Sequence, residues 1–112
     1  MAPRRPLPPY IATLVERLAP LGEVRPKAMF GGWGLYADGV FFAIVADDVL
    51  FLKVDDGNRD DYEKAGMAPF RPWPDKPTTM SYWTVPDDVE ADPGRLVAWA
   101  RKAREAQLRA KR

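Results

Sequence analysis

Cysteine and histidine are absent from this sequence of 112 residues, and serine occurs once, as Ser81. Without cysteine the chain can form no disulfide and carry out no thiol chemistry, a composition that fits a reducing compartment. Histidine is the usual base that activates a serine nucleophile and the commonest metal ligand, so a Ser-His catalytic pair is excluded. We therefore expect no catalytic residues, no metal site and no cofactor.

Long apolar runs are absent as well. No segment approaches the roughly 18 consecutive apolar residues that a transmembrane helix requires. Arg4 and Arg5 resemble the start of a secretion signal, but prolines at positions 6, 8 and 9 follow where an apolar segment would be required. We expect a cytoplasmic protein without membrane contact.

The residues that are present predict one folded domain. Hydrophobic residues make up 46% of the chain and charged residues 29%, a balance that excludes intrinsic disorder for all but the ends. Residues 1–9 contain four prolines and two arginines and are predicted to form a flexible arm. We expect the folded domain over residues 10–104 and a basic helical tail over residues 105–112.

The clearest local signals predict a β-meander over residues 24–55. Asp38 and Gly39 separate two apolar runs, and Asp-Gly is a strong hairpin signal because both turn positions take a positive φ. Asp47 and Asp48 separate the next two runs and give a second, chemically weaker two-residue turn. The strands around these turns should therefore pair antiparallel.

Side-chain alternation in this meander predicts apolar residues on both faces of the sheet. With two-residue turns, Leu35 faces Phe42 and Ile44 faces Phe51, on the same side as Trp33. The opposite side then takes Tyr36, Phe41, Ala43, Val45, Leu50, Leu52 and Val54. A sheet with one face in water alternates apolar with polar residues, so both faces need cover. Helices should cover one face, and the second is covered either by the rest of the chain or by a partner.

The remaining segments predict three helices and two short strands. An apolar stripe predicts a helix near residues 9–19, and the capping residues Asn58 and Asp92 predict helices near 58–65 and 92–108. Short strands are expected near residues 69–73 and 78–85. The expected fold class is α+β, a two-layer sandwich of a mainly antiparallel sheet and helices.

Two patterns that could carry chemistry are better explained by structure. The glycine cluster at residues 31–34 runs into a strand, whereas phosphate-binding glycine loops open a helix, so we expect a bulge or a close backbone approach. The aspartate pairs lie at turns or helix starts, where aspartate bonds its own backbone. These pairs are residues 47–48, 55–56, 60–61 and 87–88.

Charge is unevenly distributed along the chain. Residues 92–112 contain seven basic and two acidic residues, whereas residues 38–64 contain three basic and eight acidic ones. A basic helix can contact nucleic-acid phosphates, or it can simply be a solvated helix face. The candidate nucleic-acid contacts are Arg101, Lys102, Arg104, Arg109, Lys111 and Arg112.

A set of motifs resembles the N-terminal domain of TfoX/Sxy, the bacterial regulator of natural competence for DNA transformation. The resemblance extends from about Tyr10 to Ala103 and depends on a Met-Phe-Gly-Gly opening with Gly-Leu-Tyr and Leu-Lys-Val-Asp companions. Its main residues, for which we expect a structural role, are Met29, Phe30, Gly31, Gly32, Gly34, Tyr36, Lys53 and Tyr82. The resemblance implies a fold similar to type III secretion chaperones and a non-enzymatic regulatory or interaction role.

Three hypotheses for function follow. The leading one is a regulatory protein-interaction domain that contacts a protein partner, or a second copy of itself, through an apolar sheet face. The alternative is a nucleic-acid-binding accessory protein that uses the basic C-terminal helix. The third is an enzyme or small-ligand domain built on Lys53 or Tyr36, although Lys53 can also extend its ammonium to the edge of the sheet.

Overall fold

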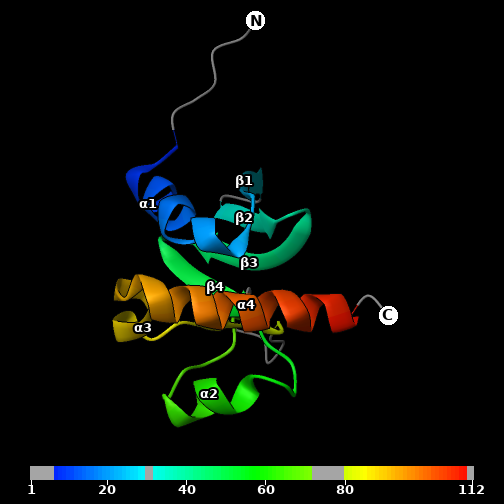
Figure 1. Ribbon diagram of the computed structural model, residues 1–112. Helices are drawn as coiled ribbons and strands as arrows, with labels where there is room; N and C mark the ends of the chain where they lie inside the picture. Colours follow the sequence, from blue (N-terminus) through cyan, green and yellow to red (C-terminus); the bar gives the residue numbers. More distant parts are fainter. Residues whose placement is uncertain (1–6, 30–31, 72–79, 111–112) are drawn as a thin grey trace, which may run out of the picture.

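The computed structural model describes residues 7–29, 32–71 and 80–110 and shows a five-stranded antiparallel sheet with helices (Figure 1). The strands follow one another in chain order and are β1 (Val24–Met29), β2 (Gly32–Ala37), β3 (Val40–Ala46), β4 (Val49–Lys53) and β5 (Tyr82–Thr84). The helices are α1 (Pro9–Arg17), the 3₁₀ turn η1 (Ala19–Leu21), α2 (Arg59–Lys64), α3 (Asp87–Ala91) and α4 (Pro93–Ala110). The expected α+β fold is confirmed.

The two aspartate turns of the meander have the backbone geometry that their residues favour. Asp38 and Gly39 have φ values of 49° and 83°, and Asp47 and Asp48 have values of 50° and 59°. Positive φ at both central positions matches the twist of the flanking strands. Aspartate tolerates this left-handed region better than most residues, which explains how the second turn forms without glycine.

One register prediction was wrong, because β3 contains a bulge. Tyr36 pairs with Phe41, but Leu35 pairs with Ala43, so Phe42 is an extra residue on β3. Phe42 and Ala43 are both fully buried on the helix-covered face, and Ile44 then lies on the other face, paired with Phe51 as expected. Because of this extra residue, the residues before the bulge pair one position away from the register that simple alternation predicts, and their faces relative to β4 are exchanged.

Helices α1 and α4 cover the face that carries the main core (Figure 1). Helix α4 lies across β3 and β4 through three alanines with no exposed surface, Ala100, Ala103 and Ala106. Small side chains let the helix approach the sheet closely. The largest buried residues of this core are Ile11, Leu14, Leu18, Leu35, Phe42, Leu50, Leu52, Tyr62, Val89 and Leu96.

The boundaries of the remaining elements agree with the sequence prediction in part. Asp92 accepts the backbone N–H groups of Gly94 and Arg95 at 3.0 and 3.3 Å, which confirms it as the cap of α4. The aspartate pair at residues 87–88, expected at a turn or helix start, lies in the first turn of the short helix α3, which was not predicted from the sequence. The strand expected near 69–73 is an isolated bridge between Pro69 and Trp83, and residues 72–73 and 78–79 lie outside the described ranges.

The ends of the domain are also placed by the structure. Helix α4 continues to Ala110 with Ala106 buried, so the first part of the predicted tail packs on the sheet. Residues 1–6 and 111–112 lie outside the described part. Among the helices that the structure describes, none has the length and apolar content needed to cross a membrane.

Tyr62 on α2 offers a test of the core. Its ring lies edge-on to Trp99 at 4.7 Å, and its buried hydroxyl has no hydrogen-bond partner among the described residues. Burial raises the pKa of this phenol. Tyr62→Phe should therefore keep the free energy of unfolding unchanged or raise it by up to about 1 kcal/mol, because an unpaired buried hydroxyl is removed. Urea denaturation measures this, and a clear loss of stability would show that the hydroxyl does have a partner.

Candidate functional site

The sheet face turned away from α1 and α4 is the first candidate surface, and we call it the outer face. Register places Arg25, Tyr36 and Phe41 on it together, because directly paired residues share a face. Its main side chains are Arg25, Lys27, Met29, Tyr36, Phe41, Ile44, Phe51, Lys53 and Tyr82. This face therefore combines aromatic, aliphatic and basic residues from all five strands.

Aromatic rings form a continuous row on the outer face. Tyr36 and Phe41 have ring centroids 5.1 Å apart, and Phe41 and Tyr82 have theirs 5.6 Å apart. Tyr82 is buried, and desolvation with the nearby Tyr36 raises the pKa of its hydroxyl to about 12. Tyr36 and Phe41 stay partly exposed. The row is thus anchored at β5 and accessible at β2 and β3.

The chain itself covers one end of the outer face. Phe70 packs on Phe51 with ring centroids 4.6 Å apart, and its backbone N–H donates to the carbonyl of Tyr82 at 2.6 Å. Val49 and Met80 keep 42% and 37% of their surface exposed, more than most large apolar side chains of the domain. The sequence predicted that either the rest of the chain or a partner would cover the second face. The chain itself covers part of that face.

The glycine cluster lets elements approach closely at the outer face. A Cβ atom on Gly34 would lie 2.5 Å from Met29 Cε and 2.7 Å from Phe41 Cε1, so the missing side chain lets Met29 and Phe41 pack over it. A Cβ atom on Gly32 would lie 2.4 Å from the carbonyl oxygen of Val45. The expected close backbone approach is confirmed at Gly32. Phe30 and Gly31 lie outside the described residues.

Lys53 lies on the outer face at the end of β4. Its ammonium donates a hydrogen bond of 2.6 Å to the Ser81 hydroxyl and lies 5.3 Å from the ring centroid of Tyr82. No carboxylate of the described ranges lies within ion-pair distance of this ammonium. Among the described residues Lys53 therefore has no ion-pair partner, although its charge interacts electrostatically with the nearby Asp55 carboxylate.

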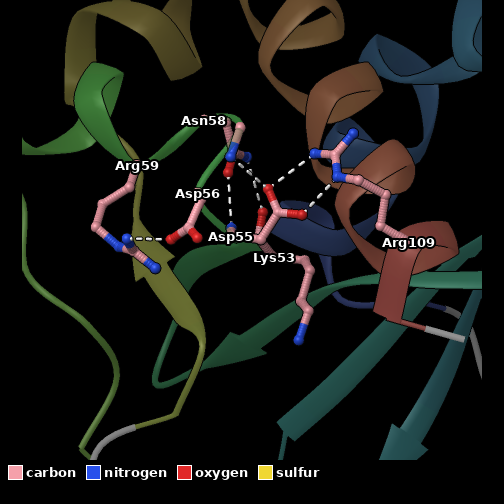
Figure 2. Close-up of polar contacts among 7 residues, drawn as sticks. Lys53, Asp55, Asp56, Asn58, Arg59 and Arg109 are labelled. Atoms are coloured by element: carbon pink, nitrogen blue, oxygen red, sulfur yellow. Dashed lines mark hydrogen bonds and ion pairs between the residues drawn. The ribbon is translucent and has the colours of Figure 1, made fainter. Parts of the chain in front are cut away.

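The Leu-Lys-Val-Asp motif continues into a polar loop, shown in Figure 2. Asp55 accepts two hydrogen bonds from Arg109 of α4, from Nε at 2.6 Å and from Nη2 at 2.8 Å. Gly57 donates its backbone N–H to the same carboxylate at 2.9 Å. A Cβ atom on Gly57 would lie 2.6 Å from Arg109 Nη2, so glycine leaves room for the guanidinium.

Asn58 fixes the backbone of this loop from inside. Its side chain is 3% exposed, accepts the backbone N–H of Asp55 at 2.8 Å and donates to the carbonyl of Lys53 at 3.0 Å. Asn58 was predicted to cap α2, but its side chain makes no bond to that helix. The difference has a physical reason. Asn58 bonds two backbone groups that precede it in the chain, and these groups would otherwise be unpaired at the end of β4.

An open cleft of about 770 Å³ lies beside the polar loop. Its polar lining includes Lys53, Arg59, Ser81 and Arg109, but Asp55 and Asp56 already pair with two of these cations. Tyr36 does not line the cleft, so the structure does not bring together the two residues of the small-ligand hypothesis. In the described part of the chain, no three acidic side chains gather closely enough to hold a metal ion.

Comparison with protein-family models places the chain in a family. The model of the TfoX N-terminal domain matches residues 16–107, which is most of the sequence. The chain belongs to the TfoX N-terminal domain family. No curated protein sequence matches it.

The residues that carry the TfoX resemblance lie together in space. Of the eight residues named for it, six are described by the structure, and register places all six on the outer face. They are Met29, Gly32, Gly34, Tyr36, Lys53 and Tyr82. Strand alternation alone places Tyr36 and Lys53 on opposite faces, so the side-chain pattern did not indicate this grouping.

The basic residues of α4 in this TfoX N-terminal domain are mostly engaged within the molecule. Lys102 pairs with Asp61 at 2.9 Å, Arg104 donates to the carbonyl of Leu21 at 2.8 Å, and Arg109 pairs with Asp55. Arg101 is exposed and makes no ion pair with another described residue, while Lys111 and Arg112 lie outside the described ranges. Three of the six candidate nucleic-acid contacts therefore stabilise the domain.

The Asp55–Arg109 pair predicts a pH dependence of stability. The guanidinium of Arg109 holds the pKa of the Asp55 carboxyl below its usual value. The pair therefore stabilises the fold at neutral pH, and this contribution is lost as the pH falls below about 4, through the folded-state pKa. Arg109→Gln should lower stability at pH 7 and lose less on acidification than the wild type. Urea denaturation over a pH series measures this, with Arg101→Gln as the matched control that should follow the wild type.

Proposed function

We propose that this TfoX N-terminal domain is a non-enzymatic regulatory module of the cytoplasm that acts by binding a macromolecular partner through its outer face. The observation that carries the proposal is the gathering of Met29, Gly34, Tyr36, Lys53 and Tyr82 on that face. The resemblance to the competence regulator supports the regulatory part.

The physical character of the outer face also supports binding. Tyr36 and Phe41 present partly exposed rings, and Val49 of β4 adds an exposed apolar side chain at the far end of the sheet. Aromatic side chains on a rigid sheet are favourable contact residues, since they offer a large surface at a small cost in conformational entropy. The buried end of the row at Tyr82 holds these rings in place.

The proposal is tested with the double variant Tyr36→Ala/Phe41→Ala. The wild-type domain, the double variant and Leu108→Ala are used as bait for cell extract, and retained partners are identified. Leu108 is the matched control, since it is a 42% exposed apolar residue on α4. We expect retention of a partner by wild type and Leu108→Ala and its loss in the double variant. Equal retention by all three proteins would overturn the proposal, as would turnover of a substrate by the purified domain.

A further inference from the structure

The charged side chains of the described strands all lie on one face of the sheet, and all of them are basic. The five strands, as the structure describes them, contain three charged residues, Arg25, Lys27 and Lys53, and no acidic residue. All three lie on the outer face, because Arg25 pairs with Tyr36, Lys27 with Gly34, and Lys53 with Tyr82. The chain as a whole has a net charge of +1. The outer face is therefore a basic surface on a nearly neutral protein.

Ion pairs among the described residues leave these charges largely uncompensated, and Asp55, which interacts with Lys53, is itself bonded to Arg109. Lys27 and Lys53 form no ion pair with any described carboxylate. Arg25 pairs with Glu23 at 2.7 Å, but the two side chains are 76% and 65% exposed, so the pair is weak and easily exchanged for another anion. The outer face consequently favours an anionic partner.

Aromatic rings separate the cations across the sheet. Tyr36 lies beside Arg25 in register, Phe41 follows at 5.1 Å and Tyr82 at 5.6 Å, and the Lys53 ammonium lies over the Tyr82 ring. The row thus begins and ends with a positive charge. A row of rings with cations at both ends, held on a sheet, is an arrangement that can bind unstacked bases and their phosphates.

The same features disfavour other partners. Two copies joined face to face by a twofold axis would bring two equal sets of cations together, which is repulsive. A duplex hides its bases, and the face of a five-stranded sheet does not enter its grooves as a helix does. A single strand exposes both phosphates and base faces to such a surface.

We propose that the outer face binds single-stranded nucleic acid, with bases stacked on Tyr36 and Phe41 and phosphates beside Arg25, Lys27 and Lys53. The proposal rests on the proposed function, since it names the partner class of the same surface. It differs from the hypothesis based on α4, where three of the cations are already engaged. With three cations the logarithm of the binding constant should fall with the logarithm of salt concentration at a slope of about −2.

Fluorescence anisotropy tests the proposal with labelled single strands of DNA and RNA about 12 nucleotides long and a duplex of the same length. Wild type should bind the single strands and bind the duplex more weakly. Tyr36→Ala should weaken binding about five- to 150-fold through the lost stacking of one base. Lys27→Gln should weaken it and reduce the salt slope by about 0.7. Arg101→Gln, which removes a solvent-exposed charge from α4, should bind within about twofold of wild type.

Three outcomes would overturn the proposal: no binding at low salt, preference for the duplex, or an Arg101→Gln loss as large as that of Lys27→Gln. Polyglutamate that competes as well as DNA would show a partner recognised by charge alone, such as an acidic protein, and would also overturn it. Circular dichroism and thermal melting confirm that each variant is folded. If no strand binds but Tyr36→Ala/Phe41→Ala still loses a protein partner, the partner class is wrong and the proposed function stands.

Discussion

Phe42→Ala should lower the free energy of unfolding by about 3–5 kcal/mol, the cost of removing a large aromatic side chain from a close-packed core. Phe42 has no exposed surface and is among the largest fully buried side chains of the domain. It reaches this position because it is the extra residue of the β3 bulge. Phe42→Leu, which keeps most of the volume, should cost less and remains measurable if the alanine variant does not fold.

The neighbouring Phe41 is the matched control for this prediction. Phe41 lies on the outer face, where it is partly exposed and contacts Tyr36 and Tyr82. Phe41→Ala should therefore cost about 1–2 kcal/mol, since less apolar surface is returned to water. Urea denaturation of both variants gives the comparison. An equal or larger loss for Phe41→Ala would show that the bulge and the face assignment are wrong.

Asn58→Ala should lower the free energy of unfolding by about 2–3 kcal/mol. The side chain is almost fully buried and bonds the backbone N–H of Asp55 and the carbonyl of Lys53. Alanine would leave both backbone groups without their partner, and each unpaired buried group costs about 1–3 kcal/mol. The loop would also loosen its hold on Arg109, because Asp55 would no longer be fixed.

Asp56→Ala is the control in the same loop. The Asp56 side chain is 94% exposed and pairs with Arg59 on the surface, so its removal should change stability by less than about 0.5 kcal/mol. Urea denaturation measures both variants, and amide hydrogen exchange follows the Asp55 N–H directly. Similar stability for Asn58→Ala and Asp56→Ala would mean that the Asn58 hydrogen bonds do not hold the loop.

The meander could be predicted from the sequence because its turns are specified locally. Asp38-Gly39 and Asp47-Asp48 carry their own backbone preferences, and the apolar runs between them leave few alternatives. The cap of α4 at Asp92 was predictable for the same reason. These features depend on residues close together in the chain.

The outer face could not be predicted in the same way. The choice between Phe41 and Phe42 for the core depends on a one-residue bulge, and both residues have the same local preference. When the bulge is missed, the residues of the strands that precede it are assigned to the wrong face relative to β4. The prediction therefore placed Tyr36 and Lys53 on opposite faces. Only the pairing of strands shows that Arg25 and Lys27 join them.

The ion pairs of α4 could not be predicted from the sequence either. Arg109 and Asp55 lie 54 residues apart, and nothing in their neighbours indicates that they meet. The charge asymmetry along the chain suggested an external anion for the basic helix. The acidic residues that neutralise it come instead from other elements of the fold, such as Asp61 of α2 for Lys102 and Asp88 of α3 for Arg95.

Amide chemical-shift mapping of the labelled domain, titrated with single-stranded DNA, tests the role of the outer face most directly. The outer-face proposal predicts that the largest shifts fall in β1, β2, the first residues of β3 and the end of β4, with Lys27, Tyr36 and Lys53 among them and α4 unchanged. Shifts concentrated on α4 around Arg101, or none at saturating DNA, would contradict it.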